Sequence, residues 1–170
     1  MKMQELFEAE KKDPDGSYVG VKFDDKSLDL LCEFVKEQNI PGALKRPDFH
    51  STVVYSRKYL PEYEAVGDIS KPWVATPKSF DIWESKPNAY KKEHTFCLVM
   101  EIDCPNMVDR HNMAREDHGA TYDYDEYKPH ITLSYDVGED FSKDGLKWEG
   151  KPLNVSNEYI EDLNLDKTYD

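Results

Sequence analysis

The segment KPHITLSYD, residues 128–136, combines a strand-forming run with two polar side chains that a strand would bring together. Isoleucine, threonine and leucine follow His130 directly, and β-branched residues favour strands. Side chains two residues apart on a strand point to the same face, so His130 lies beside Thr132 while Ile131 points away. The pattern H-x-T therefore predicts an imidazole next to a hydroxyl on one face of a strand.

A second segment, FHSTVVYSR at residues 49–57, has the same pattern. Here His50 shares a face with Thr52, and Ser51 points away. The two histidines are 80 residues apart, and so are the two threonines. One H-x-T is common by chance and would more often be structural. Two of them, each opening a strand, indicate a single shared site.

The order of predicted elements around the two segments is also repeated. A strand, a helix, a loop and an H-x-T strand occupy residues 17–56, and the same order occupies residues 95–136. This order predicts an α+β fold that is internally duplicated and bilobal, with two antiparallel sheets lining a central groove and helices on the outside. We expect one domain, residues 1–170, with half-repeats at about residues 17–92 and 93–166.

Local signals predict the remaining elements. The run SYVGVKF, residues 17–23, alternates as a half-buried strand and puts Tyr18 on the face opposite its valines. Residues 103–118 suit a helix. Prolines punctuate residues 57–92, for which we expect short strands and a hairpin loop. Residues 1–12 suit a short helix.

The charge of the chain limits its partners. The formal net charge is −13, which argues against binding long DNA or RNA, because such binding depends on lysine and arginine neutralising phosphates. A small anionic ligand can still be held by a local basic pocket. Lys45 and Arg46 precede the first H-x-T, and Lys128 precedes the second.

The remaining composition indicates a protein of the cytoplasm. The three cysteines show no C-x-x-C spacing, which favours reduced thiols over disulfides or zinc ligands. The N-terminus lacks the apolar stretch of a signal peptide, and no run reaches the ~20 apolar residues of a membrane span. We expect no membrane partner and a monomer.

Two imidazoles and two hydroxyls around one small volume suit phosphodiester cleavage without a metal. One neutral imidazole can take a proton from the attacking oxygen, and one protonated imidazole can give a proton to the leaving oxygen. The hydroxyls of Thr52 and Thr132 can donate to the nonbridging phosphate oxygens. We therefore predict His50 and His130 as the acid and base, with the two threonines binding the phosphate.

A metal site is the alternative chemistry for the paired histidines. It would need a third ligand, and threonine is a poor zinc ligand. The other histidines, His94, His111 and His118, have no matching partners, and we expect them on the surface or in helices. We therefore expect no metal and no cofactor.

The segments FHSTVVYS and PHITLSYD resemble the paired signature of the two-histidine phosphoesterase superfamily. The resemblance extends from about residue 17 to residue 163. Within the superfamily the chain looks most similar to phage anti-CBASS phosphodiesterases, which destroy the cyclic di- and trinucleotides that bacteria use as antiviral signals. The opening strand SYVGVKFD, the segment FDIWES and the closing NEYIEDL support this narrower likeness.

The resemblance implies a metal-independent phosphodiesterase that hydrolyses 3′–5′ linkages of cyclic di- and trinucleotide second messengers. A neighbouring ribose 2′-OH is the nucleophile that it implies. It assigns substrate binding to three further residues. Tyr18 corresponds to a tyrosine that contacts the phosphate, Trp83 is a candidate for stacking on a base, and Glu158 is a candidate for reading a base edge. The segment 103–128 departs most from the family pattern.

Two other functions stay open at this point. A two-histidine phosphodiesterase could instead act on RNA ends, 2′,3′-cyclic phosphates or 2′–5′ oligoadenylate. A non-catalytic module could sequester nucleotides without cutting them, although both histidines and both threonines are present. The sequence leaves the preferred bases and the ring size of the substrate open.

Overall fold

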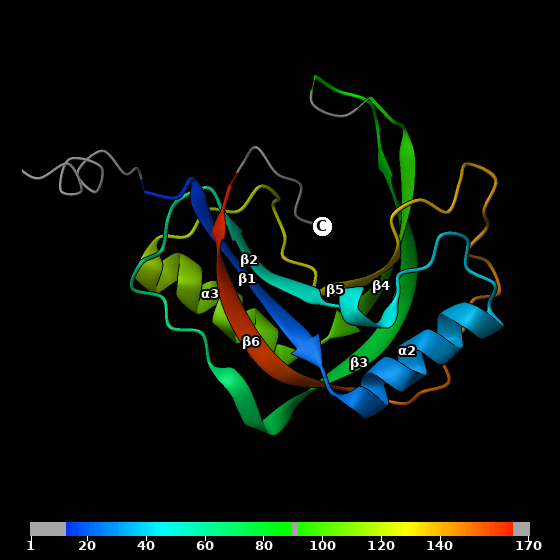
Figure 1. The fold of residues 1–170 in the computed structure, drawn as a ribbon, viewed down its shortest axis with the longest axis horizontal. Coiled ribbons are helices and arrows are strands. Elements are labelled where there is room, and N and C mark those ends of the chain that lie inside the picture. The colour runs from blue at the N-terminus through cyan, green and yellow to red at the C-terminus, as the bar shows by residue number, and fades with distance from the viewer. Residues whose placement is uncertain (1–12, 90–91, 165–170) are drawn as a thin grey trace, which may run out of the picture.

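The computed structural model describes residues 13–89 and 92–164, and the helix predicted for residues 1–12 lies outside these ranges. Figure 1 shows one curved sheet with two α-helices packed against it. The elements are β1 (Gly16–Phe23), α2 (Asp25–Glu37), the 3-10 helix η1 (Arg46–Asp48), β2 (Ser51–Ser56), β3 (Gly67–Ser85), β4 (Thr95–Asp103), α3 (Pro105–His118), β5 (His130–Ser134) and β6 (Leu153–Leu163).

The six strands form one sheet in the order β2-β1-β6-β3-β4-β5, and every neighbouring pair is antiparallel. The two strands that begin at the H-x-T motifs, β2 and β5, are therefore the two ends of the sheet. The predicted α+β class and antiparallel strands are confirmed. The duplicated, bilobal arrangement of two sheets stays a prediction, as do the single domain and its half-repeats.

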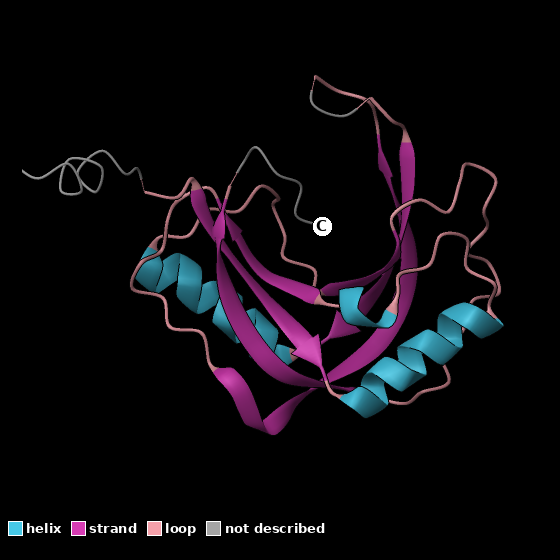
Figure 2. Cartoon of the chain, in the orientation of Figure 1, coloured by secondary structure: helices cyan, strands magenta, loops and turns pink. Residues whose placement is uncertain are grey.

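The long strand β3 differs from what the sequence suggested. Instead of several short strands, residues 67–85 form one 19-residue strand that pairs with β6 through its first half and with β4 through its second. Proline donates no hydrogen bond, so it is tolerated in a strand only at edges or irregularities. Pro72 lies inside the first register shift and Pro77 at the edge of the second. Figure 2 shows the resulting curvature of the strand.

The two helices begin and end at residues that suit these positions. The N-cap of α2 is Asp24, whose Oδ1 accepts a hydrogen bond of 2.8 Å from the backbone of Ser27. Helix α3 starts at Pro105, where a missing N–H costs little. It ends at Gly119, whose φ of 70° is the left-handed conformation that glycine adopts without strain.

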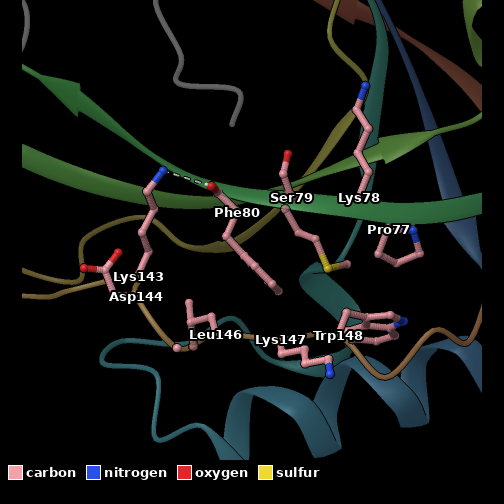
Figure 3. Close-up of a pocket in the computed structure, with 11 residues that line it drawn as sticks. Pro77, Lys78, Ser79, Phe80, Lys143, Asp144, Leu146, Lys147 and Trp148 are labelled. Carbon is pink, nitrogen blue, oxygen red and sulfur yellow. Dashed lines mark hydrogen bonds between the residues drawn. The ribbon is translucent and has the colours of Figure 1, made fainter.

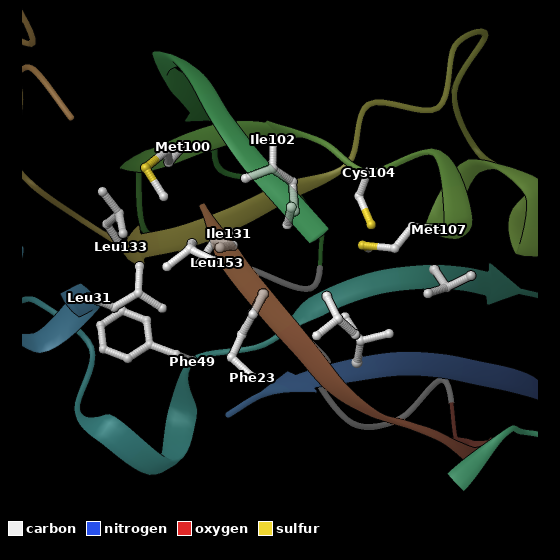
Figure 4. Close-up of a cluster of buried hydrophobic side chains, with 14 of the residues drawn as sticks. Phe23, Leu31, Phe49, Met100, Ile102, Cys104, Met107, Ile131, Leu133 and Leu153 are labelled. Carbon is white, nitrogen blue, oxygen red and sulfur yellow. The ribbon is translucent and has the colours of Figure 1, made fainter. Parts of the chain in front are cut away.

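The hydrophobic core lies between the sheet and the helices (Figure 4). It contains Leu31 from α2, Met107 from α3 and Ile131 from β5, all fully buried. The alternating face of β1 that carries Val19 and Val21 also points into it. The opposite faces of the H-x-T strands are thereby left for the candidate site. Among the described residues, no helix is long and apolar enough to span a membrane.

Candidate active site

A cavity of about 360 Å³ lies where the two H-x-T strands approach each other. This volume falls within the range of small-molecule sites. The strands meet directly, since the Ser51 hydroxyl donates to the backbone carbonyl of His130 across 79 residues of sequence. The lining residues are Thr52, Tyr55, Arg57, Trp83, Cys97, Tyr122, Asp123, Tyr124, Tyr127, His130, Thr132 and Tyr135.

The two candidate catalytic histidines are held in the same way. His50 Nδ1 lies 2.8 Å from the carbonyl oxygen of Asp48, and His130 Nδ1 lies 3.0 Å from that of Lys128. A carbonyl oxygen only accepts, so each Nδ1 is the protonated nitrogen. In the neutral ring the lone pair is then on Nε2, which is the atom left for proton transfer.

His50 lies close enough to His130 to affect the pKa of His130. Burial lowers the pKa of His130, the hydrogen bond to Lys128 opposes this shift, and the charge of His50 lowers it further. His50 does not line the cavity, and its ring lies 6.4 Å from that of Tyr18, whose hydroxyl is bonded to Thr52. The structure therefore brings both histidines to one region, with His130 favoured in the neutral state.

Tyr18 supports the first threonine. Its hydroxyl shares a 2.8 Å hydrogen bond with Oγ1 of Thr52, and burial raises its pKa well above the usual value. The phenol therefore stays protonated. Its ring is packed at 6.2 Å from that of Tyr159, beside Gly20. A Cβ at Gly20 would lie 2.5 Å from the Tyr159 hydroxyl and 2.9 Å from the Tyr18 ring, so this packing requires glycine.

A β-bulge follows the threonine of each H-x-T motif. Thr52 pairs with Gly20 and Val54 with Val19, which leaves Val53 without a partner on β1. In the same way, Thr132 pairs with Val99 and Ser134 with Leu98, which leaves Leu133 unpaired on β4. The two bulges are 80 residues apart, like the motifs themselves.

The carbonyl groups at the two bulges have different partners. His111 Nδ1 lies 2.7 Å from the Val53 oxygen, whereas the Leu133 oxygen accepts from the Leu44 amide. The His111 ring stacks at 4.0 Å on Tyr127, whose hydroxyl donates to the Thr52 carbonyl. His111 is buried and its Nε2 has no partner among the described residues. It therefore supports the strand that carries Thr52.

Trp83 lines the cavity and contacts one of the two candidate catalytic histidines. Its assignment as a ring that stacks on a base stays a prediction. Its ring centroid is 4.3 Å from that of His130 in an edge arrangement, and its Nε1 donates to Asp81. The chain's other tryptophans do not line this cavity. Trp148 packs on Phe34, and Trp73 packs against the core.

Glu158 is separated from the cavity that contains His130 and both threonines. It pairs with Val21 on the core side of β1 and is completely buried. Arg110 donates to both its carboxylate oxygens, at 2.6 and 3.0 Å. Two further donors, the Tyr63 hydroxyl and the Val66 amide, lie at 3.0 Å. These four hydrogen bonds occupy the buried carboxylate and argue against the expectation that Glu158 reads a base edge, which stays a prediction.

One wall of the cavity is formed by residues that were not among the site residues predicted from the sequence. The segment ATYDYDEYKP, residues 120–129, is named here the tyrosine loop. It contributes three tyrosines and Asp123, and the end of β2 contributes Tyr55 and Arg57. The clustering of tyrosines was visible in the sequence, but nothing in it indicated that they face the first H-x-T strand.

The basic residues predicted near the motifs do not line the cavity. Arg46 is instead paired with Asp25 and Asp29 at the start of α2. Of the remaining histidines, His94 is paired with Glu84 and His118 contacts Tyr63. Within residues 13–89 and 92–164, no three His, Cys, Asp or Glu side chains are grouped to hold a metal ion.

A second cavity lies between β3 and the loop 143–148 (Figure 3). It has a volume of about 410 Å³, and three of its lining residues are lysines. Figure 3 shows the amino groups of these lysines, Lys78, Lys143 and Lys147, well apart from one another. Lys143 donates to the Phe80 carbonyl. This cavity therefore lacks the convergent polar groups of the first.

The protein shares its fold with a bacterial enzyme of known structure. The structure of E. coli LigT complexed with ATP superposes with a TM-score of 0.51 at 13% identity, covering 88% of this chain and 87% of the other. The apo form of LigT gives a TM-score of 0.52 at 15% identity. LigT belongs to the two-histidine phosphoesterase superfamily, in agreement with the fold expected from the paired motifs.

Sequence comparison gives a narrower relationship. Residues 15–170 match the family described as anti-CBASS protein Acb1. The protein of that name from Salmonella phage S16 is 35% identical over 158 residues, covering 91% of this chain and 93% of the relative. The one from Enterobacteria phage T4 is 36% identical over 154 residues, covering 89% and 90%. The chain therefore belongs to the Acb1 family of anti-CBASS proteins.

Proposed function

We propose that the protein is a metal-independent phosphodiesterase that opens the 3′–5′ linkages of cyclic di- and trinucleotides, the signals of the defence that its family counteracts. The observation that carries this proposal is the matched setting of the two H-x-T motifs. Both histidines have Nδ1 on a backbone carbonyl two residues earlier, and both threonines face one cavity.

The two histidines can supply the two proton transfers that attack by a ribose 2′-OH requires. His130, favoured neutral by burial, takes the 2′ proton at Nε2 as the 2′ oxygen attacks phosphorus. His50 gives a proton to the 5′ oxygen as the P–O5′ bond breaks. The products of this step are a 2′,3′-cyclic phosphate and a 5′-hydroxyl, so atoms and protons balance.

Charge on the phosphate is held by neutral donors in this mechanism. The hydroxyls of Thr52 and Thr132 donate to the nonbridging oxygens, where negative charge develops in the transition state. The buried Tyr18 phenol fixes the first of these hydroxyls. The aromatic rings that line the cavity provide surfaces for the bases, and the Trp83 ring lies 4.3 Å from that of His130.

The test is incubation with cyclic di- and trinucleotides, linear 2′–5′ oligoadenylate and 2′,3′-cyclic nucleotides, all with EDTA present. Products are identified by mass. Variants His50→Ala and His130→Ala run alongside His94→Ala, a matched control whose ring lies outside the cavity. We expect EDTA-resistant opening of the cyclic substrates by the wild type and by His94→Ala, with loss in the other two.

Other results would change the assignment. Cleavage limited to the linear or 2′,3′-cyclic substrates would indicate a different two-histidine activity. Tight binding without cleavage would indicate a module that sequesters nucleotides. Unfolding of His50→Ala or His130→Ala, detected by circular dichroism, would mean that these histidines are structural.

A further inference from the structure

One ion pair lies in the wall of the catalytic cavity. Arg57, just beyond the end of β2, donates from Nε and Nη2 to the two carboxylate oxygens of Asp123, each at 3.0 Å. The guanidinium also lies 6.0 Å from the ring centroid of Tyr55. Both charged residues line the cavity together with the catalytic threonines.

The wall of the cavity carries one permanent charge of each sign. Among the described lining residues, Arg57 is the one side chain with a permanent positive charge, and Asp123 is the one carboxylate. His130 is favoured neutral. A substrate with one phosphate at the two threonines needs no further cation. A cyclic dinucleotide brings a second phosphate into a protein whose net charge is −13.

Two aromatic rings lie between Arg57 and Thr52. The Tyr55 ring beneath its guanidinium is 6.4 Å from the ring of Tyr18, whose hydroxyl is bonded to Thr52. Arg57 and Thr52 also come from the same strand region and face the same cavity. A ligand that fills the cavity from the threonines outward therefore meets the guanidinium.

The bond between Arg57 and Asp123 can be exchanged at little cost. Their side chains are 53% and 36% exposed, and ion pairs this exposed contribute little to stability. The two nonbridging oxygens of a phosphodiester can accept from the same guanidinium fork in a bidentate manner, with the same single negative charge as the carboxylate. The tyrosine loop would remain attached without this pair, because Tyr127 and Thr121 hold it to β2 through separate hydrogen bonds.

We infer that Arg57 binds a second phosphate of the substrate in place of Asp123, and so makes the enzyme selective for rings with two or more phosphates over mononucleotides. This inference rests on the proposed function. Arg57 then determines specificity, and Asp123 acts as an internal competitor that occupies the guanidinium until substrate arrives.

Two substitutions separate this role from a structural one. If Arg57 binds phosphate, Arg57→Gln raises KM for a cyclic dinucleotide about 10- to 100-fold, the effect expected for losing a hydrogen-bonded charge. Asp123→Asn frees the guanidinium and leaves KM unchanged or lower. If the pair only holds the tyrosine loop, both substitutions raise KM alike, which would overturn the inference.

The substrates and a matched control complete the experiment. With 2′,3′-cyclic AMP, which has one phosphate, Arg57→Gln should bind as the wild type does. An equal loss of affinity for both ligands would place Arg57 at the reacting phosphate and refute the inference. Lys143→Gln removes an exposed cation paired with Asp81 outside the cavity, and its KM should stay within about twofold of the wild type.

Failure of the proposed function would be recognised separately. Affinity for 3′,3′-cyclic GMP-AMP is also measured by calorimetry in the His50→Ala background, with and without Arg57→Gln, which needs no turnover. A wild type that binds but does not cleave refutes the proposed reaction and leaves the role of Arg57 to the calorimetry. Equal affinities of His50→Ala with and without Arg57→Gln refute the role of Arg57 alone. An absence of binding refutes both the proposed function and the role of Arg57.

Discussion

The buried carboxylate of Glu158 offers a quantitative test of the structure. The substitution Glu158→Gln keeps the size of the side chain but replaces one oxygen with an NH₂ group. Each of the two oxygens now accepts from two donors, with Arg110 donating to both. Whichever way the new amide is turned, its NH₂ faces two donors, and the guanidinium loses its counter-charge.

The expected cost follows from this geometry. Glu158 is fully buried and the Arg110 side chain is only 22% exposed, so the pair is little screened by water. Removing one partner of a buried ion pair costs about 3–5 kcal/mol. For a chain of this size each kcal/mol lowers the melting temperature by about 2–4 °C, so we expect Tm to fall by about 6–20 °C.

The assay is reversible urea unfolding followed by circular dichroism, with KM for a cyclic dinucleotide measured on the same samples. Glu161→Gln is the matched control, because it makes the same change at an exposed position of β6 and should shift stability by less than about 0.5 kcal/mol. Stability within about 1 kcal/mol of the wild type together with a raised KM would refute the structural role. It would restore Glu158 as a residue that contacts the substrate.

Four other predictions concern the site and the buried His111 that supports it. Tyr18→Phe should lower kcat about 2- to 10-fold without unfolding, because it removes the hydrogen bond to Thr52; steady-state kinetics would contradict this if kcat were unchanged. Trp83→Ala should weaken substrate binding about 5- to 150-fold in calorimetry, the range for one stacked base, and an unchanged Kd would exclude stacking. The acidic limb of kcat/KM should have its midpoint below about pH 6.5, because a lowered pKa keeps His130 neutral to lower pH; a midpoint above 6.5 would contradict this. Burial also lowers the pKa of His111 in the folded protein below the value of about 6.5 expected in the unfolded chain. Between these two pKa values the unfolded state binds more protons than the folded state, so stability is lost as the pH falls through this window. His111→Asn keeps a donor and should remove this part of the pH dependence of unfolding.

The pairing of a histidine with a threonine on one strand face could be predicted from the sequence because a strand has a simple period. His50 and Thr52 had to share a face, and their match with the second motif required no knowledge of the connecting loops. The same period cannot reveal the bulge after each threonine. Strict alternation would put Val54 beside Thr52, but the bulge at Val53 shifts the alternation by one residue. Val54 is therefore buried, and Tyr55 faces the cavity.

Glu158 illustrates a second limit of the sequence. A carboxylate near the end of a chain is usually solvated, and the partners that bury this one come from distant segments. Arg110 lies on α3, and Tyr63 lies in the loop before β3. A strand has two faces, and without the register of β6 on β1 the choice between them is open. That register pairs Glu158 with Val21 on the core side, and Tyr159 with Gly20 beside Tyr18.

The two halves of the site are alike where the chemistry requires it and unlike elsewhere. Each half supplies a histidine held through Nδ1, a threonine and a bulge. The first motif is contacted by the Tyr18 hydroxyl and by the tyrosine loop. The second motif has the Trp83 ring against its histidine. If the residues that occur in both halves carry out proton transfer, the residues that occur in only one half select the substrate. Substitutions at Arg57 or Trp83 should then change which ring is cleaved, while substitutions at the histidines abolish cleavage of every ring.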